Sequence, residues 1–182
     1  MKRVVIYLFI LIVVLLIDII SKDIVNHTMM ENDTITIIEN FLYFTLVYNY
    51  GTTFGLFEKT APYITIIIMK SIFIIIMIYL IFNITKIIKS SKYVNLSIIS
   101  FIIIISGSLG NIIDRLSDKR VTDFIDIGIF EYRWHIFNMA DLFQFSGGIM
   151  IIIIIIMDYW NSKYYLNNNW NSTSHKNNPH NN

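Results

Sequence analysis

The sequence contains no cysteine. This absence excludes disulfides, zinc sites built from thiolates and a cysteine nucleophile. Charge of one sign is not in excess either, because 14 Lys and Arg residues face 13 Asp and Glu residues and leave a net charge of +1. Nothing in that balance indicates binding to nucleic acid. The four histidines form neither a His-Glu-x-x-His nor a His-x-x-x-His arrangement, so no zinc motif of that kind is present.

Polar residues are also scarce for a chain of this length. Of the 182 residues, 55% are hydrophobic, and the mean hydropathy is +0.59. A soluble domain of the same size would need far more polar surface. The apolar residues come in long isoleucine-rich runs without the alternation of a half-buried strand, and such runs are typical of membrane-spanning helices.

Four apolar runs are long enough to cross a bilayer: 4–20, 61–82, 94–113 and 139–157. A helix rises about 1.5 Å per residue, so each run can cross a hydrocarbon layer roughly 30 Å thick. No small-x-small cleavage site follows the first run, so we expect it to stay as a span and not to act as a secretion signal. The sequence therefore predicts one all-α integral membrane domain over residues 1–160 and a disordered, Asn- and Ser-rich cytoplasmic tail over residues 161–182.

An even number of spans places both termini on one side of the membrane. We expect that side to be cytoplasmic because basic residues gather there, namely Lys2, Arg3, Lys86, Lys89, Lys92 and Lys163. The other side carries Lys and Arg as well, so the prediction depends mainly on the N-terminal pair and on the lysine cluster between the second and third spans. On the outer side, the β-branched and aromatic residues of segment 34–49 predict short strands with a turn at Glu39-Asn40.

Ionisable residues inside or beside the spans are informative, because a charge at the centre of a membrane helix costs roughly 2.5–3.5 kcal/mol. Three groups lie at the outer side: Asp18 with Lys22; Gly110, Asn111, Asp114 and Arg115; and Asp123 with Asn138, Ala140 and Asp141. Asp18 and Lys22 are four residues apart and can pair across one helical turn. Gly107 and Gly110 would let a neighbouring helix or a ligand approach closely. A helix-end ion pair and a polar helix end at the interface explain the first two groups without any catalytic role.

The third group supports a more specific hypothesis. Asn138 and Asp141 are three residues apart and share one face of the fourth span. Asp123 is expected in the loop after the third span, and that loop is long enough to bring it to Asp141. Two facing carboxyls share one proton, so that one can activate water while the other polarises a carbonyl. Spacing alone leaves Asp114 or Asp126 as substitutes for Asp123, and a solvated loop acid as the alternative for any of them.

Other schemes fit the sequence less well. A Ser–Lys dyad would need Ser106 or Ser108 together with Lys70, the only lysine inside a span. Lys70 either snorkels outward or pairs with one of the acids, and the sequence leaves both open. A transporter or channel would line a path with polar residues, whereas these gather at one membrane face. A lipid-modifying transferase with metal-bound acids would favour a repeated Asp-x-x-x-Asp face, which is missing.

Five motifs, in order along the chain, resemble those of the lipoprotein signal peptidase family (signal peptidase II). They are Asp18-Ile-Ile-Ser-Lys22, Asn49-Tyr-Gly-Thr-Thr-Phe54, Gly110-Asn-Ile-Ile-Asp-Arg115, Val121-Thr-Asp-Phe-Ile-Asp126 and Trp134-His-Ile-Phe-Asn-Met-Ala-Asp141. Thr52 and Thr53 stand where alanines are usual in the family, and His135 stands where proline is common. One such motif would be weak evidence, but five in order on a four-span layout are specific.

The resemblance implies four transmembrane helices with a small extracytoplasmic β-sheet and a short outer helix, in the inner (cytoplasmic) membrane of a bacterium. It implies an aspartic endopeptidase that needs no metal or cofactor and is sensitive to globomycin. The substrate would be a prolipoprotein whose cysteine carries diacylglycerol anchored in membrane lipid, cut just before that cysteine. We further expect a monomer that binds no nucleic acid.

The resemblance also assigns roles to residues of this chain. The implied catalytic pair is Asp123 and Asp141. The residues implied to line the site and hold substrate are Asn49, Gly51, Asn111, Arg115 and Asn138. The residues implied to support the site are Asp18, Lys22, Gly110, Asp114 and Ala140.

Overall fold

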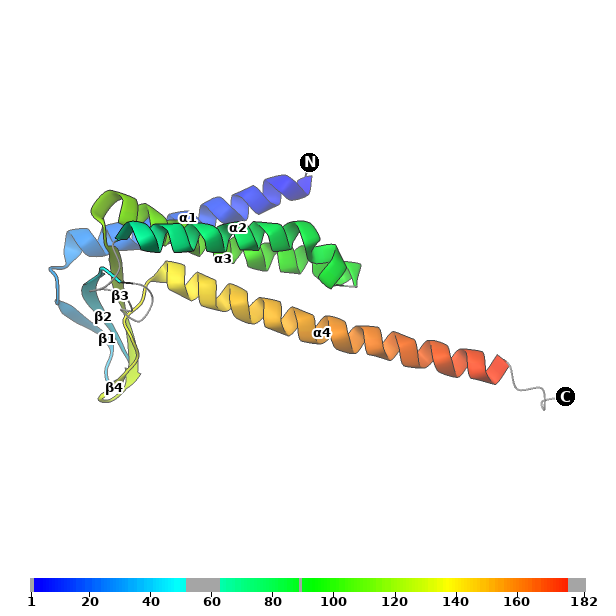
Figure 1. Ribbon diagram of the computed structural model, residues 1–182. Coiled ribbons are helices and arrows are strands. Elements are labelled where there is room, and N and C mark those ends of the chain that lie inside the picture. The colour runs from blue at the N-terminus through cyan, green and yellow to red at the C-terminus, as the bar shows by residue number, and fades with distance from the viewer. Residues whose placement is uncertain (1, 52–62, 89, 177–182) are drawn as a thin grey trace.

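A computed structural model describes residues 2–51, 63–88 and 90–176 of the chain. Its helices are α1 (Lys2–Thr28), α2 (Tyr63–Ile87), α3 (Ser91–Asp118) and α4 (Met139–Lys176). Its strands are β1 (Thr34–Ile38), β2 (Leu42–Asn49), β3 (Val121–Ile129) and β4 (Tyr132–Arg133). The strands lie together at one end of the helices, and the start of α1 and the end of α4 point away from them (Figure 1).

Each of the four helices is long and apolar enough to cross a membrane, as the sequence predicts. Isoleucine is only a moderate helix former in water. In lipid, however, every backbone N–H and C=O must be satisfied within the chain, and this requirement drives long apolar runs into helices. The helices extend past the predicted spans, since α1 continues to Thr28 and α2 to Ile87. The expected start of the second span, residue 61, lies outside the described residues.

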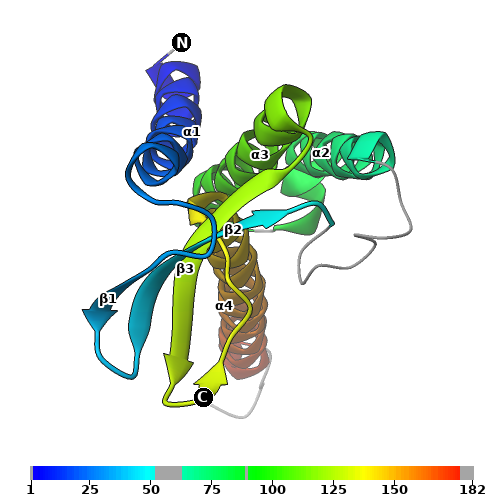
Figure 2. The same ribbon diagram turned by 90° about the vertical axis from the view of Figure 1, so that its left-hand side faces the viewer.

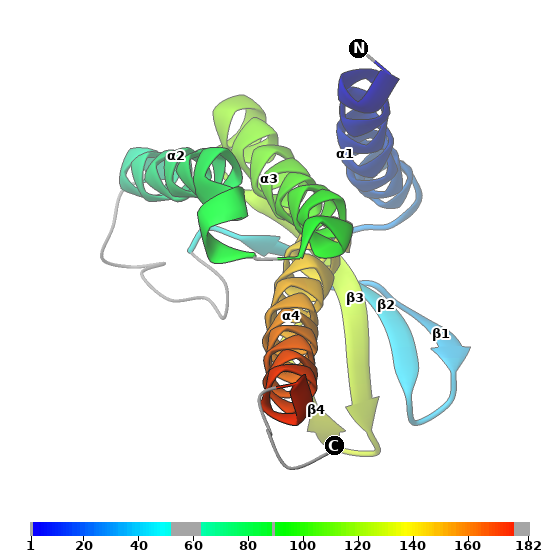
Figure 3. The same ribbon diagram turned by 90° about the vertical axis from the view of Figure 1, so that its right-hand side faces the viewer.

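Helix α3 is the centre of the bundle. It packs against α1, α2 and α4, and Figure 3 shows it between the other three helices. Its most apolar stretch is 67% buried, against 17% or less in each of the others. Two glycines permit this packing, because a Cβ atom on Gly107 would collide with the Ala140 carbonyl oxygen and one on Gly110 with the Asp18 carboxylate. The close approach predicted for these glycines is therefore present.

The strands form one antiparallel array in the order β1-β2-β3-β4. The predicted turn between β1 and β2 contains Asn40, whose φ of 59° is the left-handed conformation that asparagine tolerates. In the β2–β3 register, Asn49 lies opposite Val121. Buried residues of β2 and β3, Leu46 and Phe124 among them, pack against the end of α1, and Figure 2 shows the sheet lying across the helix ends.

The structure differs from the sequence-based expectations in three places. Asp123 lies on strand β3 and not in a loop, because β3 pairs with β2 and is buried over its first half. Residues 161–176 continue α4 where a disordered tail was expected, since a helix that is already nucleated gains one backbone hydrogen bond for each added residue. No separate short outer helix occurs among the described residues, and segment 52–62, which includes Thr52 and Thr53, lies outside them.

Candidate active site

Asp123 and Asp141 come together from strand β3 and helix α4, which only the short strand β4 separates along the chain. Asp123 lies on β3, opposite Val47 of β2, and Asp141 lies in the first turn of α4. Both line one small pocket with five other residues: Asn49, Lys70, Asn111, Arg115 and Val121. The structure therefore brings together most of the residues that the motifs predicted, from β2, β3, α3 and α4.

Asn138 fixes the position of Asp141. It immediately precedes α4, and its side-chain oxygen accepts the backbone N–H of Asp141 at 3.0 Å. Asparagine is a favoured residue at this capping position because its side chain satisfies a backbone donor that the helix leaves free. The positive end of the helix dipole also favours the carboxylate of Asp141 in the first turn.

Two asparagine side chains connect the two carboxyls. The Asn138 amide nitrogen donates to Asp123 Oδ1 at 2.6 Å and to Asn111 Oδ1 at 3.0 Å. The Asn111 amide nitrogen donates in turn to Asp141 Oδ1 at 2.9 Å. Because an amide carries both a donor and an acceptor, the chain Asp123–Asn138–Asn111–Asp141 fixes the relative position of the two acids without neutralising either.

Burial and neighbouring charges perturb the ionisation of Asp123. Only 2% of the residue is exposed, and its second oxygen accepts the amide nitrogen of Asn49 at 2.9 Å. Burial, and after it the negative charge of Asp141, raises the pKa of Asp123 to about 7, against the opposing effect of the Asn49 and Asn138 hydrogen bonds and of the Lys22 charge. Near neutral pH the two carboxyls can therefore hold a single proton between them.

Lys22 is the centre of a second, buried network. Its ammonium lies 2.7 Å from Asp18 Oδ2 and 3.0 Å from Asp114 Oδ2, and it donates to Asn111 Oδ1 at 3.0 Å. The other Asp18 oxygen accepts the backbone N–H of Ala140 at 2.8 Å. The predicted Asp18–Lys22 pair is present, and it ties α1 to α3 and to the start of α4.

Arg115 holds the end of β2. Its guanidinium donates to the carbonyl oxygen of Gly51 and, at 3.3 Å, to that of Asn111. The backbone N–H of Gly51 donates to the side-chain oxygen of Asn49 at 2.9 Å. Arg115 is almost fully buried, and its Nε finds no partner among the described residues. Arg115 therefore places a buried positive charge beside the pocket.

Two pocket residues were not assigned to the site from the sequence. Val121 lies on β3 opposite Asn49, and nothing in a single valine signals that place. Lys70 carried a signal, as a lysine within an apolar run, but its direction was open. The Ser–Lys alternative is not favoured, because the Ser106 hydroxyl donates to the Ile102 carbonyl and the Ser108 hydroxyl to Gln144. Among the described residues, no group of three or more His, Asp or Glu side chains is arranged to hold a metal ion.

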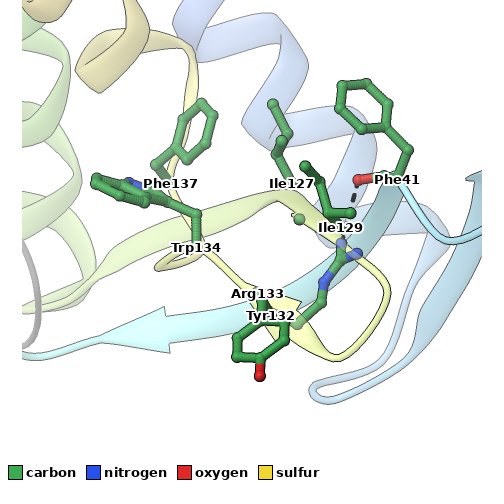
Figure 4. A pocket seen from close by; sticks show the side chains of 8 residues that line it. Phe41, Ile127, Ile129, Tyr132, Arg133, Trp134 and Phe137 are labelled. Carbon is green, nitrogen blue, oxygen red and sulfur yellow. Dashed lines mark hydrogen bonds between the residues drawn. The ribbon is translucent and has the colours of Figure 1, made fainter.

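An apolar surface adjoins the polar pocket. A pocket at the sheet is lined by Phe41, Ile127, Gly128, Ile129, Tyr132, Arg133, Trp134 and Phe137 (Figure 4). A neighbouring groove shares three of these and continues along α4, lined by Ile127, Trp134, His135, Phe137, Asp141, Leu142 and Phe145. An apolar path therefore leads directly to one of the two carboxyls.

Comparison with known proteins identifies the family of the chain. A family model described as signal peptidase (SPase) II matches residues 10–157. The chain belongs to the signal peptidase II family. Lipoprotein signal peptidases of Staphylococcus haemolyticus and Staphylococcus carnosus are each 33% identical to it over 156 residues, or 86% of this chain and 93% of each relative. The lipoprotein signal peptidase of Fusobacterium nucleatum is 35% identical over 149 residues, or 81% of this chain and 84% of the relative.

Solved structures agree with the family. Two structures described as bacterial membrane enzymes are each 32% identical to this chain, with TM-scores of 0.72 and 0.67. They cover 85% and 81% of this chain, and in each case 90% of the other chain. The resemblance found in the motifs is confirmed. This signal peptidase II is a multi-pass membrane protein and an aspartic endopeptidase that removes signal peptides from prolipoproteins, and the transporter alternative is not favoured.

Proposed function

We propose that Asp123 and Asp141 are the catalytic pair of this signal peptidase II, and that it cuts the peptide bond just before a cysteine that carries diacylglycerol. One observation carries the assignment: the two carboxyls, from β3 and α4, line one pocket and are connected through the amides of Asn138 and Asn111. The pKa of about 7 at Asp123 supports a pair that shares one proton at neutral pH.

The proposed reaction uses water and no covalent intermediate. Ionised Asp141 takes a proton from the water, and the water oxygen attacks the scissile carbonyl carbon. Protonated Asp123 gives its proton to the carbonyl oxygen. The resulting tetrahedral intermediate then breaks its C–N bond. The leaving nitrogen takes the proton from Asp141, and the hydroxyl of the new carboxyl group returns a proton to Asp123. Both acids are then in their starting states.

The neighbouring residues have separate roles in this scheme. Asn111 and Asn138 already bond the carboxyls, so they orient the acids. Arg115 and the Gly51 backbone hold the end of β2 at the pocket. Arg115 also lines the pocket, so its positive charge lies close to where the substrate backbone would bind. The supporting residues hold α1, α3 and the start of α4 together beside the pocket. They are Asp18, Lys22, Gly110, Asp114 and Ala140.

The apolar groove beside Asp141 suits the lipid-modified part of the substrate. It runs from the sheet along α4, where Leu142 and Phe145 face it. Acyl chains that stay in apolar surroundings anchor the substrate at about 0.8 kcal/mol per buried CH₂. The anchor fixes the depth of the modified cysteine, so that the bond before it reaches the two acids.

The site faces the outside of the bacterial cytoplasmic membrane, and both chain ends face the cytoplasm. Basic residues lie at the start of α1 (Lys2, Arg3), the end of α2 (Lys86), the start of α3 (Lys92) and in the second half of α4 (Lys163). The start of α1 and the end of α4 point away from the sheet (Figure 1). Tyr159 and Trp160 follow the isoleucine run of α4 and are each 61% exposed, as expected of residues at a membrane interface. Residues 1–160 form the proposed peptidase domain, because the residues that line the polar pocket all lie between Asn49 and Asp141, and the proposed enzyme is a monomer.

The test is cleavage of a diacylglyceryl-modified prolipoprotein by the purified protein. Asp123→Asn and Asp141→Asn should each abolish cleavage while the protein still accumulates in the membrane, because an amide can neither take a proton from water nor share one. Asp23→Asn is the matched control, since this acid of α1 is exposed. The assignment fails if Asp123→Asn keeps near-normal activity while Asp114→Asn loses it at normal abundance.

A further inference from the structure

Lys70 is the charged residue that the proposed reaction leaves unused. It is the only charged residue of α2 before Lys86. It is half-buried and lines the same pocket as Asp123 and Asp141. Lys70 therefore lies at the pocket of the two acids, although no direct ion pair with either acid occurs among the described residues. A lysine within a membrane span is costly, and such residues usually face a functional interior with a nameable partner.

The other cationic side chains of the site already bind partners within the protein. Lys22 is bound between Asp18 and Asp114, and Arg115 donates to backbone carbonyls. Lys70 forms no direct ion pair among the described residues, but it lines the pocket together with both carboxyls. That position leaves the carboxyls their hydrogen bonds to asparagine and still exposes them to a positive charge.

A charge count over all elements around the pocket shows what this lysine contributes. The charged groups are Asp18 and Lys22 of α1, Lys70 of α2, Asp114 and Arg115 of α3, Asp123 of β3 and Asp141 of α4. When Asp123 holds the shared proton, three carboxylates face the cations of Lys22 and Arg115, and one negative charge is in excess. Lys70 cancels that excess. An uncompensated charge in a buried site is costly, so the balanced state is the favoured one.

We propose that Lys70 is a positioning residue whose positive charge balances the Asp123–Asp141 pair and so sets the pH range in which the pair holds one proton. The inference rests on the proposed function for the role of the pair, but the charge effect itself is a property of the folded protein. A nearby cation favours the ionised form of a carboxyl. Without the Lys70 cation the pair keeps its protons to higher pH, so both limbs of the pH profile shift to higher pH.

The experiment compares the pH dependence of kcat/KM for wild type, Lys70→Met and Lys70→Arg. A single charge across a pocket of this kind corresponds to an upward shift on the order of one pH unit in Lys70→Met. Lys70→Arg keeps the charge and should keep the wild-type profile. Lys86→Met removes a lysine from the same helix away from the pocket, and it should also leave the profile unchanged. An unshifted Lys70→Met profile overturns the inference, and so does loss of activity at every pH in a protein that accumulates normally.

The absence of cysteine permits a second test with the same protein. Lys70→Cys carries the only thiol of the chain, and alkylation with 2-bromoethylamine attaches an aminoethyl group that restores a positive charge. The modified protein should return toward the wild-type profile, whereas alkylation with iodoacetamide, which adds no charge, should leave the profile shifted. Complete labelling without recovery overturns the inference.

Infrared titration of the aspartate carboxyls separates this inference from the proposed function. Lys70→Met should shift the carboxyl titration upward in the folded protein, with or without substrate. If the protein does not cleave prolipoprotein but the titration shifts, the proposed function fails and the role of Lys70 stands. If cleavage occurs and neither the profile nor the titration moves, the role of Lys70 fails alone.

Discussion

Replacement of Lys22 by methionine is the most direct test of the buried network behind the site. The ammonium of Lys22 touches Asp18 and Asp114 at 2.7 and 3.0 Å, and its side chain is only 3% exposed. Methionine fills a similar volume but leaves two carboxylates without their cation. Breaking a buried pair in this way costs roughly 3–5 kcal/mol, because the remaining charge is buried and uncompensated. At roughly 2–4 °C per kcal/mol for a chain of this length, Tm should fall by about 6–20 °C.

The same helix contains the control for this prediction. Asp23 and His27 have the same four-residue spacing on α1 and lie 3.3 Å apart, but their side chains are 68% and 76% exposed. Exposed pairs contribute about 0–1 kcal/mol, so Asp23→Asn should lower Tm by no more than about 4 °C. Thermal unfolding in one detergent, followed by circular dichroism, measures both variants.

A double variant distinguishes the loss of charge compensation from a loss of packing. Lys22→Met combined with Asp18→Asn removes one of the two uncompensated carboxylates, and asparagine keeps an oxygen for the Ala140 N–H that Asp18 accepts. The double variant should therefore be more stable than Lys22→Met alone. Equal losses for Lys22→Met and Asp23→Asn, or a double variant less stable than the single one, would refute the electrostatic account.

Three further predictions concern activity. The kcat/KM should fall as pH rises through about 7, because burial and Asp141 raise the pKa of Asp123 to about 7 and the pair loses its proton above that value; a rate still rising at high pH would contradict this. Chelators and serine- or thiol-directed reagents should leave cleavage intact and globomycin should block it, while a loss on chelation that one metal restores would count against the aspartic mechanism. Unmodified prolipoprotein should be cut far more slowly than the diacylglyceryl form, and equal turnover in one detergent would contradict the anchoring argument.

The sequence predicted those parts of the fold that have a clear hydrophobic pattern or that place polar residues in the membrane at a high free-energy cost. Long apolar runs have only one stable form in lipid, so the four helices followed from composition. The β1–β2 turn followed from β-branched residues on both sides of Asn40. Polar residues in spans are costly, and this cost alone distinguishes Asp18, Asn111 and Asp141 from the apolar residues around them.

The parts that the sequence did not predict lack such a signal. Strand β3 is buried on both faces over its first half, so its residues do not alternate, and the acids within it resemble a solvated loop. Helix α2 is apolar all round, so no polar face reveals which way Lys70 points. The pairing of Asp123 with Asp141 depends on the β2–β3 register, which is a tertiary property.

The motif Gly110-Asn-Ile-Ile-Asp-Arg115 shows how one helix connects the bundle to the site. Residues four apart on a helix share a face, so Gly110 lies beside Asp114. This face meets α1, because the missing side chain of Gly110 makes room for the Asp18 carboxylate and Asp114 bonds Lys22. A larger residue at position 110 would therefore displace Asp18, which also holds the start of α4.

The second face of the same motif, Asn111 with Arg115, meets the pocket. Asn111 donates to Asp141, and Arg115 holds the Gly51 carbonyl. The two faces are coupled, because the Asn111 oxygen accepts from both Lys22 and Asn138. A shift of α1 relative to α3 would therefore move the Asn111 amide, which positions the Asp141 carboxyl. The order of the motif follows from this geometry: one residue sets the helix spacing, its neighbour aligns an acid, and the residues one turn later bind the ion-pair network and the end of the sheet.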